Sequence, residues 1–165
     1  MASLERVKVM IIDDSIHMIH IVKSLLRGFG CKLMVEAKDA GEAFDRLKSD
    51  QVDLIICDYQ MEVLDGIDFV RLVRNSSDST HRYVPIIMLT AHSDRSRVVA
   101  ARDAGVTEFC CKPVTAIELY RKIMAVVNFN RPYIKTSTFF GPDRRRKTNT
   151  VYEGKERRRG DELAL

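Results

Sequence analysis

Short runs of β-branched and other apolar residues alternate five times with longer stretches of helical spacing, and this alternation constrains the fold most. The runs lie at residues 7–12, 32–36, 52–57, 86–89 and 106–110. Runs that are apolar throughout indicate strands buried on both faces. Apolar residues at every third or fourth position indicate helices that cover those faces. We therefore expect an α/β fold, a doubly wound parallel sheet of five strands with right-handed connections.

Capping residues indicate where several of the predicted helices begin and end. Asp39 and Glu42 have the spacing of a capping box, so a helix is expected to follow Asp39. Gly28 is expected to end the first helix and Gly105 the fourth, because glycine adopts the left-handed conformation without a steric penalty. The predicted helices span residues 15–28, 40–49, 67–75, 94–104 and 116–128.

The charge is distributed unevenly along the chain. Residues 1–130 carry 17 Lys/Arg and 18 Asp/Glu, whereas residues 131–165 carry 10 Lys/Arg and 5 Asp/Glu. The second segment lacks the apolar pattern that an independent core needs. We therefore expect one folded domain over residues 1–130 and a basic, flexible extension over residues 131–165. The same shortage of apolar residues argues against a DNA-binding domain there.

The extension contains a compact aromatic and basic segment that is a candidate for docking on a partner. Its residues are Phe139, Phe140, Arg144, Arg145 and Arg146. Three interpretations stay open at this point. The segment is a solvated tail, or it docks on a protein through its two phenylalanines, or its arginines contact nucleic acid or an anionic membrane.

We expect a soluble, cytoplasmic protein without a membrane span. No apolar run approaches the roughly 20 residues that a membrane-spanning helix needs, and the N-terminus does not resemble a secretory signal. The cysteines have no metal-binding spacing, and three of them lie in or at the end of apolar runs, which indicates buried thiols in a reducing compartment. The four cysteines of the chain are Cys31, Cys57, Cys110 and Cys111.

Four of the five predicted strands lead into side chains that can bind ions or phosphate. These are Asp13 and Asp14 after the first strand, Asp58 after the third, Thr90 after the fourth and Lys112 after the fifth. In open parallel sheets, ligands bind beyond the carboxyl ends of the strands, so we expect these side chains to converge. Three neighbouring carboxylates repel one another, and a hard cation such as Mg²⁺ relieves that repulsion. The ammonium group of Lys112 would balance the remaining charge.

A carboxylate in such a site can also act as a nucleophile and form an aspartyl phosphate. That reaction needs an in-line attacking oxygen, a metal ion on the phosphoryl oxygens, and donors for the other oxygens. Asp58, Mg²⁺, and Thr90 with Lys112 would supply these parts. The residues therefore indicate phosphoryl transfer to Asp58.

The chain resembles the receiver domain of two-component response regulators over residues 6–128. Each shared element alone is weakly specific, and the resemblance depends on their occurring together in the family's order. They are Asp13-Asp14, Asp58, Met61, Gly66, Leu89-Thr90-Ala91 and Phe109-Cys110-Cys111-Lys112-Pro113. The resemblance implies a flavodoxin-like receiver fold with strand order 2-1-3-4-5. It also implies a stand-alone receiver, similar to those of chemotaxis, with a basic extension.

The resemblance further implies a phosphoacceptor site with a bound metal ion. Asp58 would accept a phosphoryl group from a phosphohistidine on a sensor histidine kinase or a phosphotransfer protein. Asp14, Asp58 and the backbone carbonyl of Gln60 would bind Mg²⁺ directly. Asp13 would act through a metal-bound water.

The family also implies residues that contact the phosphoryl group and respond to it. Lys112 and Thr90 would contact the phosphoryl oxygens, and Thr90 would form the switch together with Phe109. Pro113 would follow a cis peptide bond, which proline makes accessible.

Some positions depart from the family's pattern or vary within it. Glu62 stands where many receivers have proline, and Phe109 replaces a frequent tyrosine. Gln60 and His92 lie where the family sets the rate of dephosphorylation, so both are candidate modulators of the phosphoryl lifetime.

The favoured hypothesis is a signalling protein that is not an enzyme. Phosphorylated on Asp58, it would act on an unknown output protein through protein–protein interaction, as a monomer or weak dimer. The alternative is a constitutive binding protein whose basic tail contacts nucleic acid or an acidic partner and is indifferent to Asp58. A third hypothesis, a phosphatase on the same fold, lacks an obvious second water-activating base beside Asp58.

Overall fold

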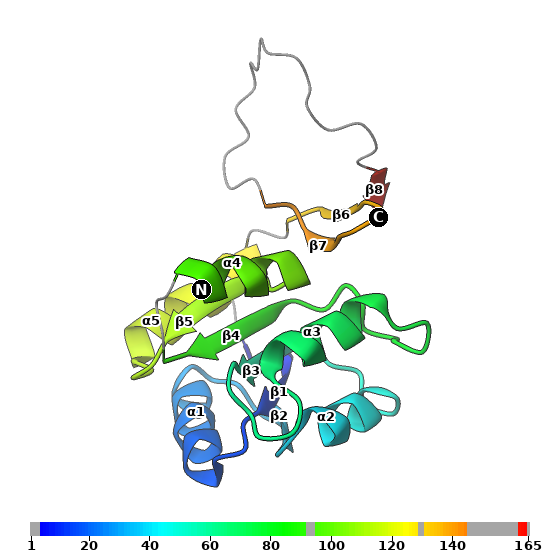
Figure 1. Ribbon diagram of the computed structural model, residues 1–165. Coiled ribbons are helices and arrows are strands. Elements are labelled where there is room, and N and C mark those ends of the chain that lie inside the picture. Colours follow the sequence, from blue (N-terminus) through cyan, green and yellow to red (C-terminus); the bar gives the residue numbers. More distant parts are fainter. Residues whose placement is uncertain (1–3, 92–94, 129–130, 145–161, 165) are drawn as a thin grey trace.

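The computed structural model describes residues 4–91, 95–128, 131–144 and 162–164 (Figure 1). The strands of the larger sheet are β1 (Lys8–Ile12), β2 (Leu33–Ala37), β3 (Leu54–Asp58), β4 (Ile86–Thr90) and β5 (Glu108–Cys111). The helices are α1 (Ile16–Gly28), α2 (Ala40–Leu47), α3 (Gly66–Asn75), α4 (Arg95–Ala104) and α5 (Ala116–Asn128). A smaller sheet contains β6 (Tyr133–Lys135), β7 (Phe140–Pro142) and β8 (Glu162–Ala164).

The larger sheet is parallel throughout and has the order β2-β1-β3-β4-β5. This confirms the doubly wound α/β fold and the flavodoxin-like strand order. The register places Ile12 beside Cys57 and Thr90 beside Cys111. The carboxyl ends of β1, β3, β4 and β5 therefore meet at one edge of the sheet. Ligands bind at this edge in such folds, where the strand order reverses.

Helices cover both faces of the sheet, as the apolar runs predicted. On one face, α1 and α5 bury residues such as Ile19 and Ile123. On the other face, α2, α3 and α4 bury residues such as Leu47, Phe69 and Ala101. Successive strand residues point to opposite faces, so only strands apolar at every position can fill both layers. None of the helices in the described part of the chain is long and apolar enough to cross a membrane.

Two predicted helix boundaries are confirmed. The Asp39 side chain accepts a hydrogen bond from the backbone N–H of Glu42 at 2.8 Å, which caps α2. Gly105 follows α4 with a φ of +110°, a conformation that favours glycine.

The end of α1 differs from the prediction. The helix continues through Gly28, and the residue with positive φ is Gly30, at +85°. In this position the N–H of Cys31 bonds back to the carbonyl of Leu26 at 3.0 Å, and the N–H of Gly30 bonds to that of Arg27 at 2.9 Å. This is a Schellman arrangement, which satisfies carbonyls at the end of the helix. Both glycines can end a helix, and only the backbone hydrogen bonds distinguish them.

Residues 131–144 pack against the domain, which differs from the flexible extension expected from residue 131 onward. β6 pairs antiparallel with β7 on one side and with β8 on the other. Tyr133 and Phe140 are only 7% and 8% exposed, and both rings pack on Tyr83 with centroids 5.3 Å apart. Aromatic side chains bury large apolar areas, which stabilises the docked segment. The surface that they cover belongs to earlier parts of the chain, so local composition did not reveal it.

Arg74 connects the extension to the interior of the domain. Its side chain is almost fully buried, and burial lowers the pKa of its guanidinium group below the ordinary value. The guanidinium donates to the backbone carbonyls of Arg82, Val84 and Gly105 at 2.6–3.1 Å. Tyr133 covers it, with 5.2 Å from Cζ to the ring centroid. Carbonyls of the domain therefore satisfy the donors of this buried charge, and the Tyr133 ring of the extension covers it.

The candidate docking residues therefore have separate outcomes. Phe140 is buried against the chain's own domain and is not exposed to a partner. Phe139 lies under the guanidinium of Arg144, 4.0 Å from Cζ to the ring centroid. Arg145 and Arg146 lie outside the described residues.

Candidate functional site

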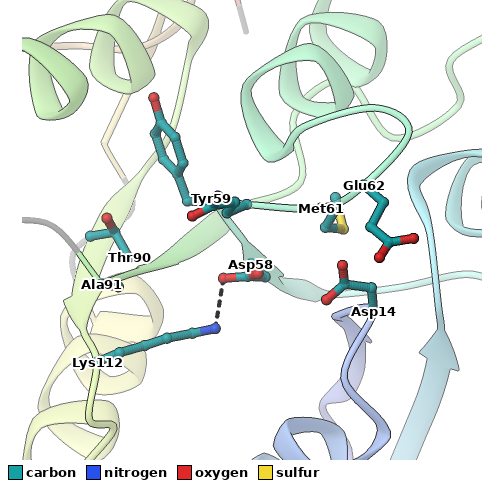
Figure 2. A pocket seen from close by; sticks show the side chains of 9 residues that line it. Asp14, Asp58, Tyr59, Met61, Glu62, Thr90, Ala91 and Lys112 are labelled. Carbon is teal, nitrogen blue, oxygen red and sulfur yellow. Dashed lines mark ion pairs between the residues drawn. The ribbon is translucent and has the colours of Figure 1, made fainter.

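A cleft of about 520 Å³ lies at the carboxyl ends of the strands. Figure 2 shows it from close by, with the side chains of Asp14, Asp58 and Lys112 directed into it. Its lining residues are Asp14, Asp58, Tyr59, Gln60, Met61, Glu62, Thr90, Ala91 and Lys112. The sheet therefore brings together the residues that sequence analysis placed at separate strand ends.

Three carboxylates form the acidic part of this site. Asp13 and Asp14 follow β1, and Asp58 is the last residue of β3. One carboxylate oxygen from each residue lies within 4.8 Å of the other two. Asp13 and Asp58 are buried, whereas Asp14 is exposed. The side chain of Asp13 also accepts a hydrogen bond from the backbone N–H of Ser15 at 2.9 Å, which fixes its orientation.

Lys112 supplies the positive charge of the cleft. Its Nζ lies 2.8 Å from Oδ1 of Asp58 and 3.5 Å from Oδ2 of Asp13. Burial acts to lower the pKa of Lys112. The hydrogen bond to Asp58 and the attraction of Asp58 and Asp13 outweigh burial, so the pKa lies above the ordinary value of 10.5. Lys112 is therefore a permanent cation at neutral pH.

One lysine does not balance the two buried acids. Burial is the largest influence on both, and it raises the pKa values of Asp13 and Asp58 above 3.8. The hydrogen bonds and attraction from Lys112 oppose this rise, and the charge of Asp14 adds to it. The site is thus arranged so that additional positive charge would stabilise its ionised form.

The donor set fits a hard divalent cation. Carboxylate oxygens are the ligands that Mg²⁺ prefers, and one side of the cleft is open for the waters that Mg²⁺ retains. Gln60 is exposed and lines the same cleft, at the position whose backbone carbonyl was expected to be a further ligand. Burial, with a smaller contribution from the neighbouring acids, raises the pKa values of Asp13 and Asp58, and a bound cation would favour their ionised forms.

The other predicted residues lie around the same edge of the sheet. Thr90 ends β4 and lines the cleft, and its carbonyl accepts a hydrogen bond from the N–H of Lys112 at 2.8 Å. Phe109 is half-buried in β5 and packs against the core on the side of α2, α3 and α4. The peptide bond between Lys112 and Pro113 is cis, as the resemblance implies. His92, the second candidate modulator, lies outside the described residues.

Four residues of the cleft were not predicted as part of the site: Tyr59, Met61, Glu62 and Ala91. Met61 and Ala91 were noted only as elements shared with the family. Tyr59 follows Asp58 directly, and its ring lies 5.6 Å from Cζ of Arg97 on α4. Glu62 was noticed only because it replaces proline, and its carboxylate lines the cleft. The nearness of Tyr59 to Asp58 in sequence was an available signal. The direction of Glu62 was not, because it depends on the path of the loop.

The loop from Gln60 to Asp65 has little freedom at its base. A Cβ atom on Gly66 would collide with the backbone carbonyl oxygen of Asp58, so the position requires glycine. The N–H of Gly66 donates to the carbonyl of Tyr59 at 2.9 Å, which closes the loop. The Gly66 noted in the sequence therefore allows α3 to begin directly beside the cleft.

Comparisons with known proteins agree with this geometry. The family model of the response regulator receiver domain matches residues 9–124. The chemotaxis protein CheY of Pseudomonas aeruginosa is 37% identical over 116 residues, which cover 70% of this chain and 92% of that protein. The chemotaxis protein CheY-3 of Vibrio cholerae is 34% identical over 119 residues, 72% of this chain and 90% of that protein.

Solved structures show the same fold. CheY4 of Vibrio cholerae superposes with a TM-score of 0.67 at 30% identity, over 73% of this chain and 98% of that one. The receiver domain of a sensor histidine kinase from Pseudomonas aeruginosa has a TM-score of 0.66 at 24% identity, over 77% of this chain and 99% of that one. That structure holds a magnesium ion in its active site cleft. The region that the family model matches ends before the extension.

Proposed function

This chain belongs to the response regulator receiver family, and we propose that it accepts a phosphoryl group on Asp58, with Mg²⁺ bound beside it. The observation that carries the proposal is the gathering of Asp13, Asp14, Asp58 and Lys112 in one cleft. This arrangement does not stabilise the fold, because three close carboxylates repel one another.

The proposed reaction follows from the positions of the side chains. An oxygen of Asp58 attacks the phosphorus of a phosphohistidine on a histidine kinase or a phosphotransfer protein. The bond from phosphorus to the imidazole nitrogen breaks, and a bond from phosphorus to the Asp58 oxygen forms. Mg²⁺, held by Asp14, Asp58 and the Gln60 carbonyl with Asp13 acting through water, would neutralise charge on the phosphoryl oxygens.

Two further groups of this chain face the transferred phosphoryl group in the proposal. Lys112 already contacts Asp58 at 2.8 Å and can move its ammonium group onto a phosphoryl oxygen. Thr90 lines the same cleft, and its hydroxyl is a donor for another oxygen. Both are preorganised around the reacting carboxylate, so they stabilise charge without a large rearrangement.

The output is proposed to be a change in protein–protein interaction. Thr90 ends β4, and Phe109 lies on the adjacent strand β5, with its ring half-buried. A shift of the Thr90 hydroxyl toward the phosphoryl group would let Phe109 repack. The surface formed by α4, β5 and α5 would then favour a different set of contacts. In this proposal the protein transmits a signal in the cytoplasm and does not turn over external substrates.

The test is direct phosphorylation of the full chain. The protein is incubated with Mg²⁺ and acetyl phosphate and its intact mass is measured. We expect a gain of about 80 Da, the mass of one phosphoryl group, which Asp58→Asn does not show. An equal gain in the variant, or none in the wild type, contradicts the proposal. Binding to nucleic acid or an acidic protein that depends on residues 131–165 and ignores Asp58 would favour the constitutive alternative.

A further inference from the structure

Glu62 and Asp14 line the same side of the cleft (Figure 2). The two residues come from different loops, Asp14 from the one after β1 and Glu62 from the one after β3, and both line the same hollow. Figure 2 shows the carboxylate of Glu62 directed toward that of Asp14. Both side chains are exposed, so each stands on the open side of the site rather than beside Lys112.

The loop around Glu62 holds it in this place. Met61, the residue before it, is 7% exposed and inserts its side chain into the core. Beyond it, Asp65 caps α3 by accepting a hydrogen bond from the N–H of Asp68 at 2.9 Å. A buried anchor on one side and a capped helix on the other restrict the backbone between them. The fold therefore fixes the backbone of Glu62 beside the cleft, and the exposed side chain extends from that point.

Glu62 is placed differently from the three acids that would bind the cation directly. It is not among the carboxylates whose oxygens lie within 4.8 Å of one another. Mg²⁺ keeps several of its waters in protein sites. A carboxylate on the open side of the cleft is then in a position to accept hydrogen bonds from those waters and to attract the cation through them.

We infer that Glu62 is a positioning residue that tightens cation binding from the open side of the cleft and opposes the arriving phosphoryl group. This inference rests on the proposed function of the site. The attraction to a dication and the repulsion of an anion have the same origin, the negative charge of Glu62. One substitution should therefore change the two affinities in opposite directions, which a purely structural role would not do.

The experiment uses the full chain and Glu62→Gln, which keeps the shape of the side chain and removes its charge. Mg²⁺ is titrated calorimetrically into each protein, and beryllofluoride, an anionic mimic of the phosphoryl group, is then titrated at saturating Mg²⁺. We expect Glu62→Gln to weaken Mg²⁺ binding by roughly three- to tenfold and to strengthen beryllofluoride binding by a similar factor.

A second variant controls for the total charge. Val63 is 90% exposed and next to Glu62, so Glu62→Gln with Val63→Glu keeps the net charge but moves the carboxylate off the cleft. We expect it to behave like Glu62→Gln. Wild-type affinities in either variant, or a change of both affinities in the same direction, overturn the inference. If Mg²⁺ binds neither the wild type nor Asp14→Asn, the result would instead contradict the proposed function.

Discussion

The ammonium group of Lys112 lies 2.8 Å from a carboxylate oxygen of Asp58, although α3, β4, α4 and β5 separate the two residues in the chain. Asp58 ends a central strand, and Lys112 follows the edge strand of the same sheet. The contact reaches past β4, which lies between β3 and β5 in the sheet. It joins the proposed nucleophile to Lys112, the one cationic side chain among the described residues that line the cleft.

Removing this cation should slow phosphorylation. With Lys112→Met, a phosphoryl oxygen loses its charged donor, so we expect the rate of labelling by acetyl phosphate to fall at least about tenfold. The measurement is the time course of intact mass in Mg²⁺. Lys48→Met is the matched control, because Lys48 pairs with Asp45 at the surface, outside the cleft. An unchanged rate in Lys112→Met would remove Lys112 from the mechanism.

The two buried acids should make stability depend on pH when no divalent cation is present. The pKa values of Asp13 and Asp58 are raised above 3.8 in the folded state, so the folded form holds protons that the unfolded form releases. The stability these groups contribute is complete below about pH 3.8 and is lost as pH rises through the folded pKa values. At neutral pH in a chelator, Asp58→Asn should therefore raise the melting temperature by about 2–5 °C.

Two controls accompany this melting experiment. Asp45→Asn changes an exposed acid and should not raise the melting temperature. Saturating Mg²⁺ should stabilise the wild type more than Asp58→Asn, because the variant lacks one of the carboxylates. A lower melting temperature for Asp58→Asn in the chelator would show that the cost of burying the ionised Asp58 carboxylate is not the dominant effect.

His81 should give a second pH dependence with the opposite sign. Its Nε2 accepts from the N–H of Val52 at 3.2 Å, and its Nδ1 lies 2.7 Å from the hydroxyl of Thr80, which donates to the carbonyl of Leu47. Burial lowers the pKa of His81 below 6.5, so the folded state favours the neutral ring. The stability this gives is present above about pH 6.5 and is lost as pH falls toward the folded pKa. Denaturant titrations of the wild type and His81→Gln are compared between about pH 7.5 and 5. The free energy of unfolding should depend less on pH in the variant.

The docked extension should contribute to global stability. A chain that ends at residue 130 loses the buried rings of Tyr133 and Phe140 and exposes Arg74, so we expect a loss of about 3–5 kcal/mol in the free energy of unfolding. A chain that ends at residue 144 keeps these contacts and should lie within about 1 kcal/mol of the full chain. Equal stability of both truncated chains in urea titrations would show that the packed segment adds nothing.

Alanine substitutions at Gly141 and Gly28 should change the free energy of unfolding in opposite directions. A Cβ on Gly141 would lie 2.8 Å from the Cα of Gly105 and 2.9 Å from Cζ of Phe139, so Gly141→Ala should cost about 1–3 kcal/mol. Gly28 lies inside α1, and a Cβ there meets nothing within 4 Å. Gly28→Ala should instead stabilise the protein by about 0.5–1 kcal/mol, because alanine favours helices. Thermal or urea unfolding measures both, and a harmless Gly141→Ala would mean that the extension can shift.

The sequence alone determined the layered α/β fold and the gathering of Asp13, Asp14, Asp58 and Lys112. Strands buried on both faces must be apolar at every position, so their number and order along the chain are visible as five short runs. Parallel strands place their carboxyl ends at one edge. The polar residues that follow four of the five runs are then brought to the same edge whatever the details of the packing. The strand order itself came from the resemblance and not from these patterns.

Only the tertiary structure decided the direction of Glu62, the glycine that ends α1 and the fate of residues 131–144. The fate of residues 131–144 depends on surfaces supplied by distant parts of the chain, and the direction of Glu62 depends on the path of its loop. The glycine that ends α1 is identified only by the backbone hydrogen bonds of Gly30 and Cys31. The rings of Tyr133 and Phe140 become buried because Tyr83 and Arg74 lie where the extension returns. Periodicity and capping act over a few residues, whereas these contacts join segments that meet only after the sheet has formed. The local sequence therefore carries no signal for them.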